Sequence, residues 1–278
     1  MALEEFSIAG NLLRILSLDA TPSTNNYATA LLAAHEAGEG TLVLTFRQTQ
    51  GRGHGKNVWE SEEGKNLTFS LVLEPHFLEA SRQFLLSQVV SHGLAHYLAG
   101  KMEEKVDLQP HPSLSCEKKN LVAIKWPNDI YIGLRKIAGI LIENSVMGQH
   151  LRWSVAGIGL NINQNTFPSH LPRAISLKMV TGREYDLQEC LKELTRHIYV
   201  WYEKLRKGKY REINEKYLSL LLGREANLTY RTGERSFQAR VEGVDPFGQL
   251  LLRTDQGEVT SWPFKSVELV TGEDNGVL

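Results

Sequence analysis

Cysteine and long apolar runs are both scarce in this chain of 278 residues. Its two cysteines, Cys116 and Cys190, are far apart and form no CxxC pair, which argues against a disulfide framework or a cysteine zinc site and fits a reducing compartment. No run of about 18 apolar residues occurs, so we expect no membrane span. Glu4 and Glu5 stand where a signal peptide carries positive charge. These absences predict a cytoplasmic protein without a membrane partner.

An excess of charge of either sign is also missing. Lys and Arg number 31 and Asp and Glu number 32, a net charge of -1, whereas a domain that binds nucleic acid through its phosphates is normally basic. Hydrophobic residues make up 42% and charged residues 23%, which is ordinary globular composition. At roughly 150 residues per domain, the length predicts about two domains. A globular protein that does not bind DNA is the expectation.

Most of the chain mixes predicted strands and helices. Apolar and β-branched runs predict strands over 41–46, 67–73, 121–125, 130–132, 137–143 and 153–162. Apolar spacing of three and four predicts a short helix over 23–35 that Ser23 caps and Gly38 follows, a long amphipathic helix over 77–102, and two helices within 186–222 that Gly208 separates. This mixture predicts an α+β fold.

The sequence pattern changes near Gly223, from mixed helices and strands to short strands and turns. From residue 226 onwards, short strand-like runs (ANLTY, SFQARVEGV, QLLLRT, EVTSW) alternate with the turn signals RTGE, DPFG and DQG. Short strands at this spacing are typical of a small barrel or sandwich. We therefore expect two domains, over 1–223 and 224–278.

A glycine-rich loop over 48–56 (QTQGRGHGK) directly follows a predicted strand. Glycines let the backbone turn sharply and bring bare N–H groups to an anion, and Arg52 adds donors suited to phosphate oxygens. The loop is not a Walker A loop, because Asn57 follows Lys56 where Ser or Thr is needed. A flexible surface loop with a single arginine explains the same residues equally well.

Two further clusters admit two interpretations each. The run Lys125–Tyr131 (KWPNDIY) is either a hairpin corner, since Pro127 ends a strand and Asn and Asp favour turns, or part of a site. The run 135–143 (RKIAGILIE) opens an apolar strand with a basic pair. Lys136 is there either a solvated strand end or a site residue, with Gly139 permitting close approach by a ligand.

Taken together, five segments in this order resemble the biotin protein ligases. They are STNNYA at 23–28, the GRG loop ending in Trp59, KWPNDIYI at 125–132, RKIAGILIE at 135–143 and GIGLNIN at 157–163. The resemblance implies a biotin/lipoate ligase-like catalytic domain, related to class II aminoacyl-tRNA synthetases, followed by a small SH3-like β-barrel. It resembles the type without an N-terminal DNA-binding domain, because the stretch before Ser23 is too short for one.

The resemblance also implies a reaction in two steps. Biotin and ATP give biotinyl-5′-adenylate and pyrophosphate, and a lysine of a biotin carboxyl carrier domain then takes the biotin and releases AMP. The implied small molecules are biotin, ATP and Mg²⁺ bound with the substrate, and the implied partner is a carboxylase's carrier domain. The sequence does not decide between a monomer and a homodimer.

Site residues follow from the resemblance position by position. The implied catalytic residues are Arg52, Lys136 and Asp129. Biotin would be bound by Ser23, Thr24, Asn25, Gln48, Arg52, Gly53, His54, Lys136 and Gly139. ATP or the adenylate would be bound by Arg52, Trp59, Lys125, Asn128, Lys136 and Asn161. Trp59 is equally well explained as a core aromatic. His54 departs from the family, since many relatives have a second arginine there, so its charge would depend on pH.

Other classes of function remain to be separated by experiment. A lipoate or octanoate ligase shares the fold but has consecutive glycines near a histidine, and a non-catalytic sensor would bind biotin or the adenylate without turnover. His92 and His96 are four apart on a predicted helix, but Gly93 stands where a helical metalloprotease motif needs glutamate, so we expect no metal site from side chains alone.

Overall fold

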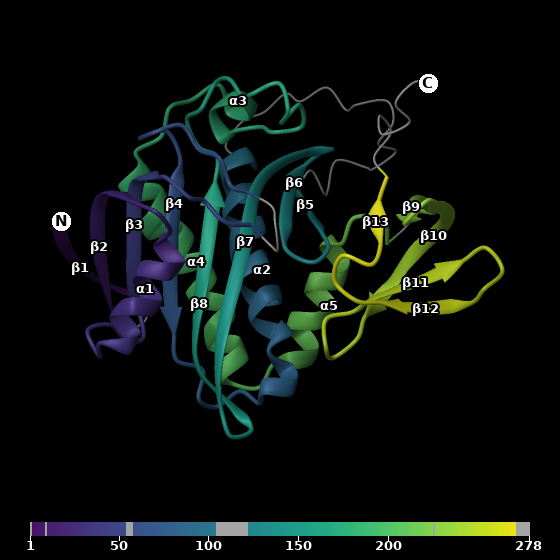
Figure 1. Ribbon diagram of the computed structural model, residues 1–278, viewed down its shortest axis with the longest axis horizontal. Coiled ribbons are helices and arrows are strands. Elements are labelled where there is room, and N and C mark those ends of the chain that lie inside the picture. Colours follow the sequence, from purple (N-terminus) through teal and green to yellow (C-terminus); the bar gives the residue numbers. More distant parts are fainter. Residues whose placement is uncertain (1, 9, 54–57, 104–121, 225, 271–278) are drawn as a thin grey trace.

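The protein consists of a large mixed β-sheet flanked by helices and a smaller antiparallel sheet at its side (Figure 1). The computed structural model describes residues 2–8, 10–53, 58–103, 122–224 and 226–270. Within these ranges the large sheet has eight strands in the order β1-β2-β3-β4-β8-β7-β6-β5, and the smaller has five in the order β12-β11-β10-β9-β13. Segregated helices and largely antiparallel strands confirm the predicted α+β class.

The eight strands of the large sheet pair antiparallel except at β2–β3, which is parallel. Their bounds are β1 Ala2–Ile8, β2 Asn11–Thr21, β3 Thr41–Gln48, β4 Leu67–Leu73, β5 Val122–Lys125, β6 Asp129–Ile132, β7 Arg135–Met147 and β8 His150–Leu160. Central strand β4 is buried at all seven positions because both faces of the sheet are covered. The strands predicted from apolar runs are confirmed, whereas β1 and β2 were not predicted.

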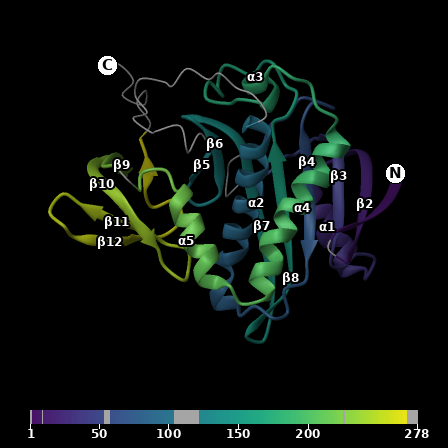
Figure 2. The ribbon, with the colours of Figure 1, turned by 180° about the vertical axis from the view of Figure 1, so that it is seen from behind.

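Helices cover the two faces of this sheet unequally. Helix α1 (Thr24–Ala33) lies on one face alone, while α2 (Phe84–Glu103), α4 (Leu187–Arg206) and α5 (Tyr210–Leu220) pack behind the other (Figures 1 and 2). The short helices α3 (Leu177–Thr181) and η1 (Ala80–Arg82) complete the helices of the described ranges. None of the helices described is long and apolar enough to cross a membrane.

Two predictions about helices need correction. The long helix begins at Phe84 and not at 77, and it is not amphipathic, because the sheet covers one side of it and α4 and α5 cover the other. Ser23 does cap α1, its Oγ accepting from the Asn26 N–H, but the left-handed residue that follows the helix is His35 (φ 59°) and not Gly38. The break at Gly208 (φ 68°) between α4 and α5 is confirmed.

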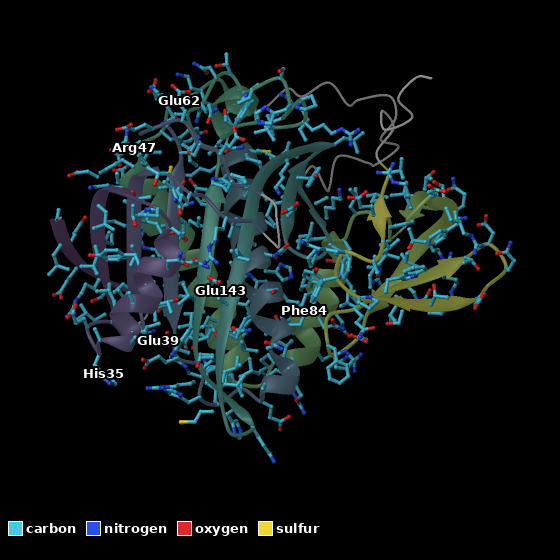
Figure 3. The ribbon with its side chains drawn as sticks, in the orientation of Figure 1. His35, Glu39, Arg47, Glu62, Phe84 and Glu143 are labelled. Carbon is cyan, nitrogen blue, oxygen red and sulfur yellow. The ribbon has the colours of Figure 1, made fainter. Side chains whose placement is uncertain are left out.

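The small sheet packs against the end of the large one at β5 and β6. Its strands are β9 Leu228–Thr232, β10 Arg235–Val244, β11 Leu250–Thr254, β12 Val259–Trp262 and β13 Glu268–Leu269, and in the described ranges β12 and β13 are its open edges. Trp126 donates its indole N–H to the carbonyl of Gly248 (2.9 Å) and stacks on Phe264, with ring centroids 5.2 Å apart. Phe84 lies at this junction (Figure 3), against the backbone of Gly248, where a Cβ would come within 2.5 Å of its ring. Close packing therefore joins the two sheets.

Candidate active site

A cavity of about 350 Å³ opens on the α1 face of the large sheet and extends to the small sheet. Residues far apart in sequence meet there. Of the residues singled out from the sequence, those lining it are Ser23, Thr24, Asn25, Gln48, Arg52, Gly53, Trp59, Lys125, Asn128, Asp129, Lys136 and Gly139. A concave site that gathers polar groups from several elements is the usual form of a small-molecule binding site.

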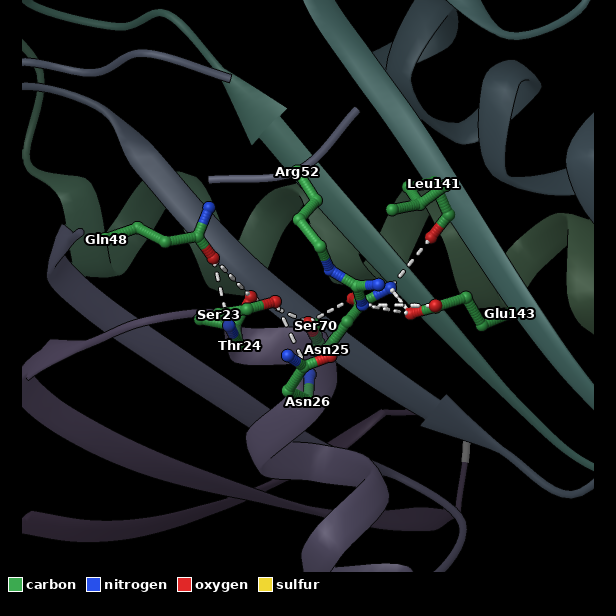
Figure 4. A network of polar contacts seen from close by, with 9 residues as sticks. All are labelled: Ser23, Thr24, Asn25, Asn26, Gln48, Arg52, Ser70, Leu141 and Glu143. Carbon is green, nitrogen blue, oxygen red and sulfur yellow. Dashed lines mark hydrogen bonds and ion pairs between the residues drawn. The ribbon is translucent and has the colours of Figure 1, made fainter. Parts of the chain in front are cut away.

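One end of the cavity is neutral and bound together by side-chain hydrogen bonds. The hydroxyl of Ser70 on β4 lies 2.6 Å from Oδ1 of Asn25 and 2.8 Å from Oγ1 of Thr24 (Figure 4). The backbone N–H of Thr24 donates to Oε1 of Gln48 (2.9 Å), which leaves the amide nitrogen of Gln48 as a donor at the cavity. Ser23, Thr24 and Asn25 are all buried. This end offers fixed neutral donors and acceptors.

Glycines form the floor of the cavity. Gly139 on β7 pairs with Gly159 on β8, and the ring of Trp59 lies across both, because a Cβ on Gly159 would come 2.1 Å from the ring and one on Gly139 3.3 Å. Gly157 gives the same room to Asn25, whose Oδ1 would lie 2.3 Å from a Cβ there. Side chains at these positions would displace Trp59 and Asn25, so the close approach requires glycine.

The other end of the cavity is positively charged. Nζ of Lys136 lies 2.8 Å from a carboxylate oxygen of Asp129 and 5.9 Å from the centroid of the Trp59 ring. Lys125 lies close by, and burial lowers the pKa of its ammonium while the carboxylates of Asp129 and Glu268 oppose the shift. The result is a cluster of cations partly balanced by carboxylates.

A β-bulge aims Lys136 into the cavity. Ile130 of β6 pairs with Ala138, but the next residue, Tyr131, pairs with Lys136, so Ile137 is an extra residue on β7. Since side chains alternate between faces along a strand, the extra residue places Lys136 on the same face as Gly139. Ile137 instead joins the core on the opposite face. The expectation that Lys136 lies at the start of a strand is confirmed.

Arg52 reaches the cavity from the glycine-rich loop and pairs with Glu143 of β7. Its Nη2 lies 3.1 Å and 2.9 Å from the two carboxylate oxygens of Glu143 (Figure 4). The same carboxylate accepts a bond from Nδ2 of Asn25 (2.7 Å). The arginine side chain is 41% exposed, so a ligand in the cavity can reach it.

The KWPND segment is both a hairpin corner and a wall of the cavity. Lys125 and Asp129 pair across the β5–β6 hairpin, and the turn between them is fixed by two bonds to its outside. Nδ2 of Asn128 donates to the carbonyl of Ile140 (2.6 Å), and the hydroxyl of Tyr217 on α5 donates to the carbonyl of Pro127 (2.6 Å). The segment therefore forms a hairpin corner, and the same residues also line the cavity.

Several singled-out residues lie elsewhere. Asn161 is buried beside the cavity without lining it, and its Nδ2 donates to the carbonyl of Ile175 (3.1 Å). His54 and Cys116 lie outside the described residues. The histidines at positions 92 and 96 lie in different environments. His92 is buried against Trp201, and His96 contacts His197.

Sequence reasoning missed two groups of residues that shape the cavity. Ser70 lies in no recognised motif, and Gly157 and Gly159 lie in the GIGLNIN segment, of which only Asn161 was named as a site residue. Residues of the small sheet that line the cavity were also missed, namely Tyr230, Phe264, Lys265 and Glu268. The repeated glycines of GIGL, two apart on one strand, were the signal available for the floor.

The family model, two curated proteins and a solved structure that resemble this chain all belong to ligases. Residues 17–161, over half of the chain, match the model of the biotin/lipoate A/B protein ligase family. The chain is similar to the bifunctional ligase/repressor BirA of Bacillus subtilis, with 34% identity over 238 residues that cover 81% of this chain and 65% of that protein. This chain thus spans less than two thirds of that relative.

Two further similarities cover nearly whole relatives. The biotin–[acetyl-CoA-carboxylase] ligase of Paracoccus denitrificans is 29% identical over 85% of this chain and 93% of its own length. The structure of a biotin protein ligase from Aquifex aeolicus in complex with biotin and ATP superposes with a TM-score of 0.70 at 25% identity, over 93% of this chain and 99% of that one.

Proposed function

The chain belongs to the biotin/lipoate A/B protein ligase family, and from this premise we propose that it joins biotin to a lysine of a carboxyl carrier domain. In the first step the biotin carboxylate attacks the α-phosphate of ATP, forming biotinyl-5′-adenylate and releasing pyrophosphate. In the second step the lysine amine attacks the carbonyl of this mixed anhydride, and AMP leaves with the electron pair of the broken bond. The similar proteins are named for biotin ligation, and one similar structure holds biotin and ATP.

One observation carries the proposal: cations from three separate segments line one cavity together with a buried group of neutral donors and acceptors. These cations are Arg52, Lys125 and Lys136, and Arg52 lies next to the neutral group because it shares the carboxylate of Glu143 with Asn25. A carboxylate approaching a triphosphate brings like charges together, at about 4 kcal/mol for each pair near 4 Å with an effective dielectric of about 20. Cations held in place before the reaction offset this repulsion, and such preorganised charge is often the largest catalytic contribution.

We assign the neutral end to the ring system of biotin. Its cyclic urea has two N–H donors and one carbonyl acceptor, which complement the hydroxyl and amide groups of Ser23, Thr24, Asn25 and Gln48. At Gly139 the glycine floor makes room for the Trp59 ring and the end of Lys136, and a substrate there would contact these two side chains. Gly53, and His54 by the resemblance, would follow Arg52 around the carboxylate.

The charged end would then hold the reacting groups. Lys136 and Arg52 would contact the carboxylate and the α-phosphate, Trp59 and Asn128 would border the nucleotide together with Lys125, and Asp129 would orient the acceptor amine. Mg²⁺ fits this site, since it binds through phosphates and one or two carboxylates, and Asp129 and Glu268 line the cavity. When bound, Mg²⁺ would screen the charge of the phosphates. Asn161 would shape the nucleotide end from outside the lining.

The rest of the molecule supports a two-domain arrangement. We propose a catalytic domain over 1–223 and a C-terminal domain of SH3-like type over 224–278, divided at Gly223 (φ 87°). The C-terminal region contributes Phe264 and Glu268 to the cavity lining, which supports a role for this region in binding ATP or the carrier domain. A cytoplasmic location and the absence of DNA binding remain part of this proposal.

Biotin-dependent exchange of pyrophosphate into ATP tests the first step. We expect exchange with MgATP and biotin and none with lipoate or octanoate, followed by transfer of labelled biotin to one lysine of an added carrier domain. Binding of biotin without exchange would identify a sensor, and exchange with lipoate in place of biotin would identify the related ligase. Either result would overturn the proposal.

A further inference from the structure

We propose that Glu143 is a positioning residue that aligns the two ends of the cavity. The inference rests on the proposed function and gives a role to a residue that does not itself line the cavity. Its carboxylate accepts three contacts from two segments: Nη2 of Arg52 contacts both oxygens, and Nδ2 of Asn25 contacts Oε2. One side chain thus connects the glycine-rich loop, helix α1 and strand β7 (Figure 4).

Stability alone does not explain this ion pair. The side chains of Arg52 and Glu143 are 41% and 36% exposed, and pairs so open to solvent contribute about 1 kcal/mol or less. The pair lies beside the cavity, and its arginine comes from a loop in which Gly51 and Gly53 flank it. The backbone here is held by a β-bridge between Arg52 and Val58, but the long arginine side chain has rotamer freedom, so a side-chain contact is needed to fix its guanidinium.

The geometry leaves Arg52 able to bind a substrate while it is held. Only Nη2 contacts Glu143, and Nε and Nη1 have no partner within the described part of the chain. Because the guanidinium is planar and rigid, anchoring Nη2 fixes the direction of the other donors. Glu143 therefore presents the remaining donors of Arg52 to an anion in the cavity.

Glu143 also fixes Asn25 at the neutral end, because Nδ2 of Asn25 donates to its carboxylate. Its Nδ2 also donates to the carbonyl of Leu141 (3.2 Å), and its Oδ1 accepts from Ser70. Ser70 in turn contacts Thr24, which is bonded to Gln48. A shift of Glu143 would move both the group assigned to the biotin ring and the group assigned to its carboxylate, so Glu143 sets the distance between the two ends.

A double-mutant cycle of Glu143→Ala and Arg52→Ala tests this role in the full-length protein. Biotin KM and kcat are measured by biotin-dependent pyrophosphate exchange. If Glu143 acts through Arg52, Glu143→Ala raises the biotin KM about tenfold while kcat changes less than about threefold. The double variant then shows a KM increase well below the product of the two single increases, because the second substitution removes an interaction already lost.

The matched control is Glu242→Ala, which removes an exposed Arg253–Glu242 pair (2.8 Å) on the small sheet and is expected to leave KM unchanged. An unchanged KM in folded Glu143→Ala, or increases that multiply in the double variant, would overturn the positioning role. A lower KM would also overturn it, since Glu143 would then compete with the substrate for Arg52. Absence of exchange in the parental protein would instead refute the proposed function.

Discussion

The two ends of the cavity are built in opposite ways. At the neutral end Ser23, Thr24 and Asn25 are buried, and Ser70 joins Thr24 and Asn25 by short hydrogen bonds. The side chains of the cations Arg52 and Lys136 are 41% and 34% exposed, and each pairs with a carboxylate. Neutral polar groups can be buried once they are hydrogen-bonded, whereas an isolated charge in a dry site is far more costly.

This difference has a consequence for how each end binds. The neutral end already holds its donors and acceptors in place, so it is preorganised for binding and a ligand there requires little rearrangement. The charged end keeps its cations near water and near carboxylates until a more negative ligand arrives. Substitution of Lys136 should therefore affect the reaction most, whereas substitutions at the neutral end should mainly affect binding.

The largest effect is expected from Lys136→Ala. Lys136 lines the cavity, and removing this cation, which we propose contacts the reacting atoms, should lower biotin-dependent pyrophosphate exchange about a thousandfold while the fold is kept. Circular dichroism checks the fold, and exchange rates check the activity. Lys178→Ala, which removes a lysine paired with Glu184 (3.1 Å) outside the cavity, serves as the control. A folded Lys136→Ala protein with parental exchange would show that the charged end is misassigned.

The next largest effect concerns His92, a buried ionisable side chain outside the cavity. Because an unpaired charge is costly to bury, its imidazole should be neutral in the folded protein. Burial on α2, with Lys216 and His96 nearby, lowers the pKa of His92 to about 4 from 6.5. Between pH 4 and 6.5, His92 binds a proton in the unfolded chain but not in the native protein. The free energy of unfolding therefore falls as the pH drops from 6.5 towards 4. The full loss is about 3 kcal/mol.

Urea unfolding at pH 7 and pH 5 measures this loss. His92→Phe keeps a ring to stack on Trp201 and should remove part of the pH dependence that the parental protein shows. If both proteins lose equal stability between the two pH values, His92 does not carry the effect.

Gly157→Ala tests the neutral end with a single added methyl group. The new Cβ would lie 2.3 Å from Oδ1 of Asn25 and would push this side chain out of its bonds to Ser70 and Glu143. We expect the biotin KM to rise about thirtyfold, equivalent to about 2 kcal/mol, with a smaller change in kcat. Gly100→Ala, where no atom lies within 4 Å of the added Cβ, is the control. A decrease in kcat alone would contradict the division between the ends.

The smallest effect is expected from Ser70→Ala. The loss of one hydroxyl leaves Asn25 and Thr24 in place but without their shared partner. A net hydrogen bond contributes about 1 kcal/mol, so the biotin KM should rise about fivefold. Ser219→Ala on α5, whose hydroxyl bonds only to the carbonyl of Lys216 among the described residues, should leave KM unchanged. Equal effects of the two variants would show that Ser70 does not act on the site.

The sequence predicted the interior of the large sheet well because strands buried on both faces are continuous apolar runs. Leu67–Leu73 is such a run, and β4 has the predicted bounds. The edge strand β1 and its neighbour β2 carry exposed Glu, Arg and Asp residues among their apolar ones, so composition did not distinguish them from a loop. The error over α2 has a related cause, since a helix covered on two sides lacks a polar stripe.

The candidate site was predictable in part. The family resemblance identified Arg52, Asp129 and Lys136, whereas the local patterns alone were explained equally well by a surface loop, a hairpin corner and a solvated strand end. Ser70 and Glu143 were not identified, because each is an ordinary residue whose importance depends on what lies opposite it across the sheet. The contribution of Phe264 was also hidden, since no local pattern shows that the small sheet turns this residue towards Trp126.

The bulge at Ile137 makes the orientation of Lys136 depend on residue number as much as on residue type. If β7 kept all its residues but paired with β6 without the bulge, the lysine would turn towards the hydrophobic interior, although every charged group of the motif would still be encoded. The side of the sheet on which this ammonium group lies therefore depends on the pairing register as well as on the motif. Homologous sequences should be compared by the number of residues between the hairpin and Gly139 and by whether the bulge is kept.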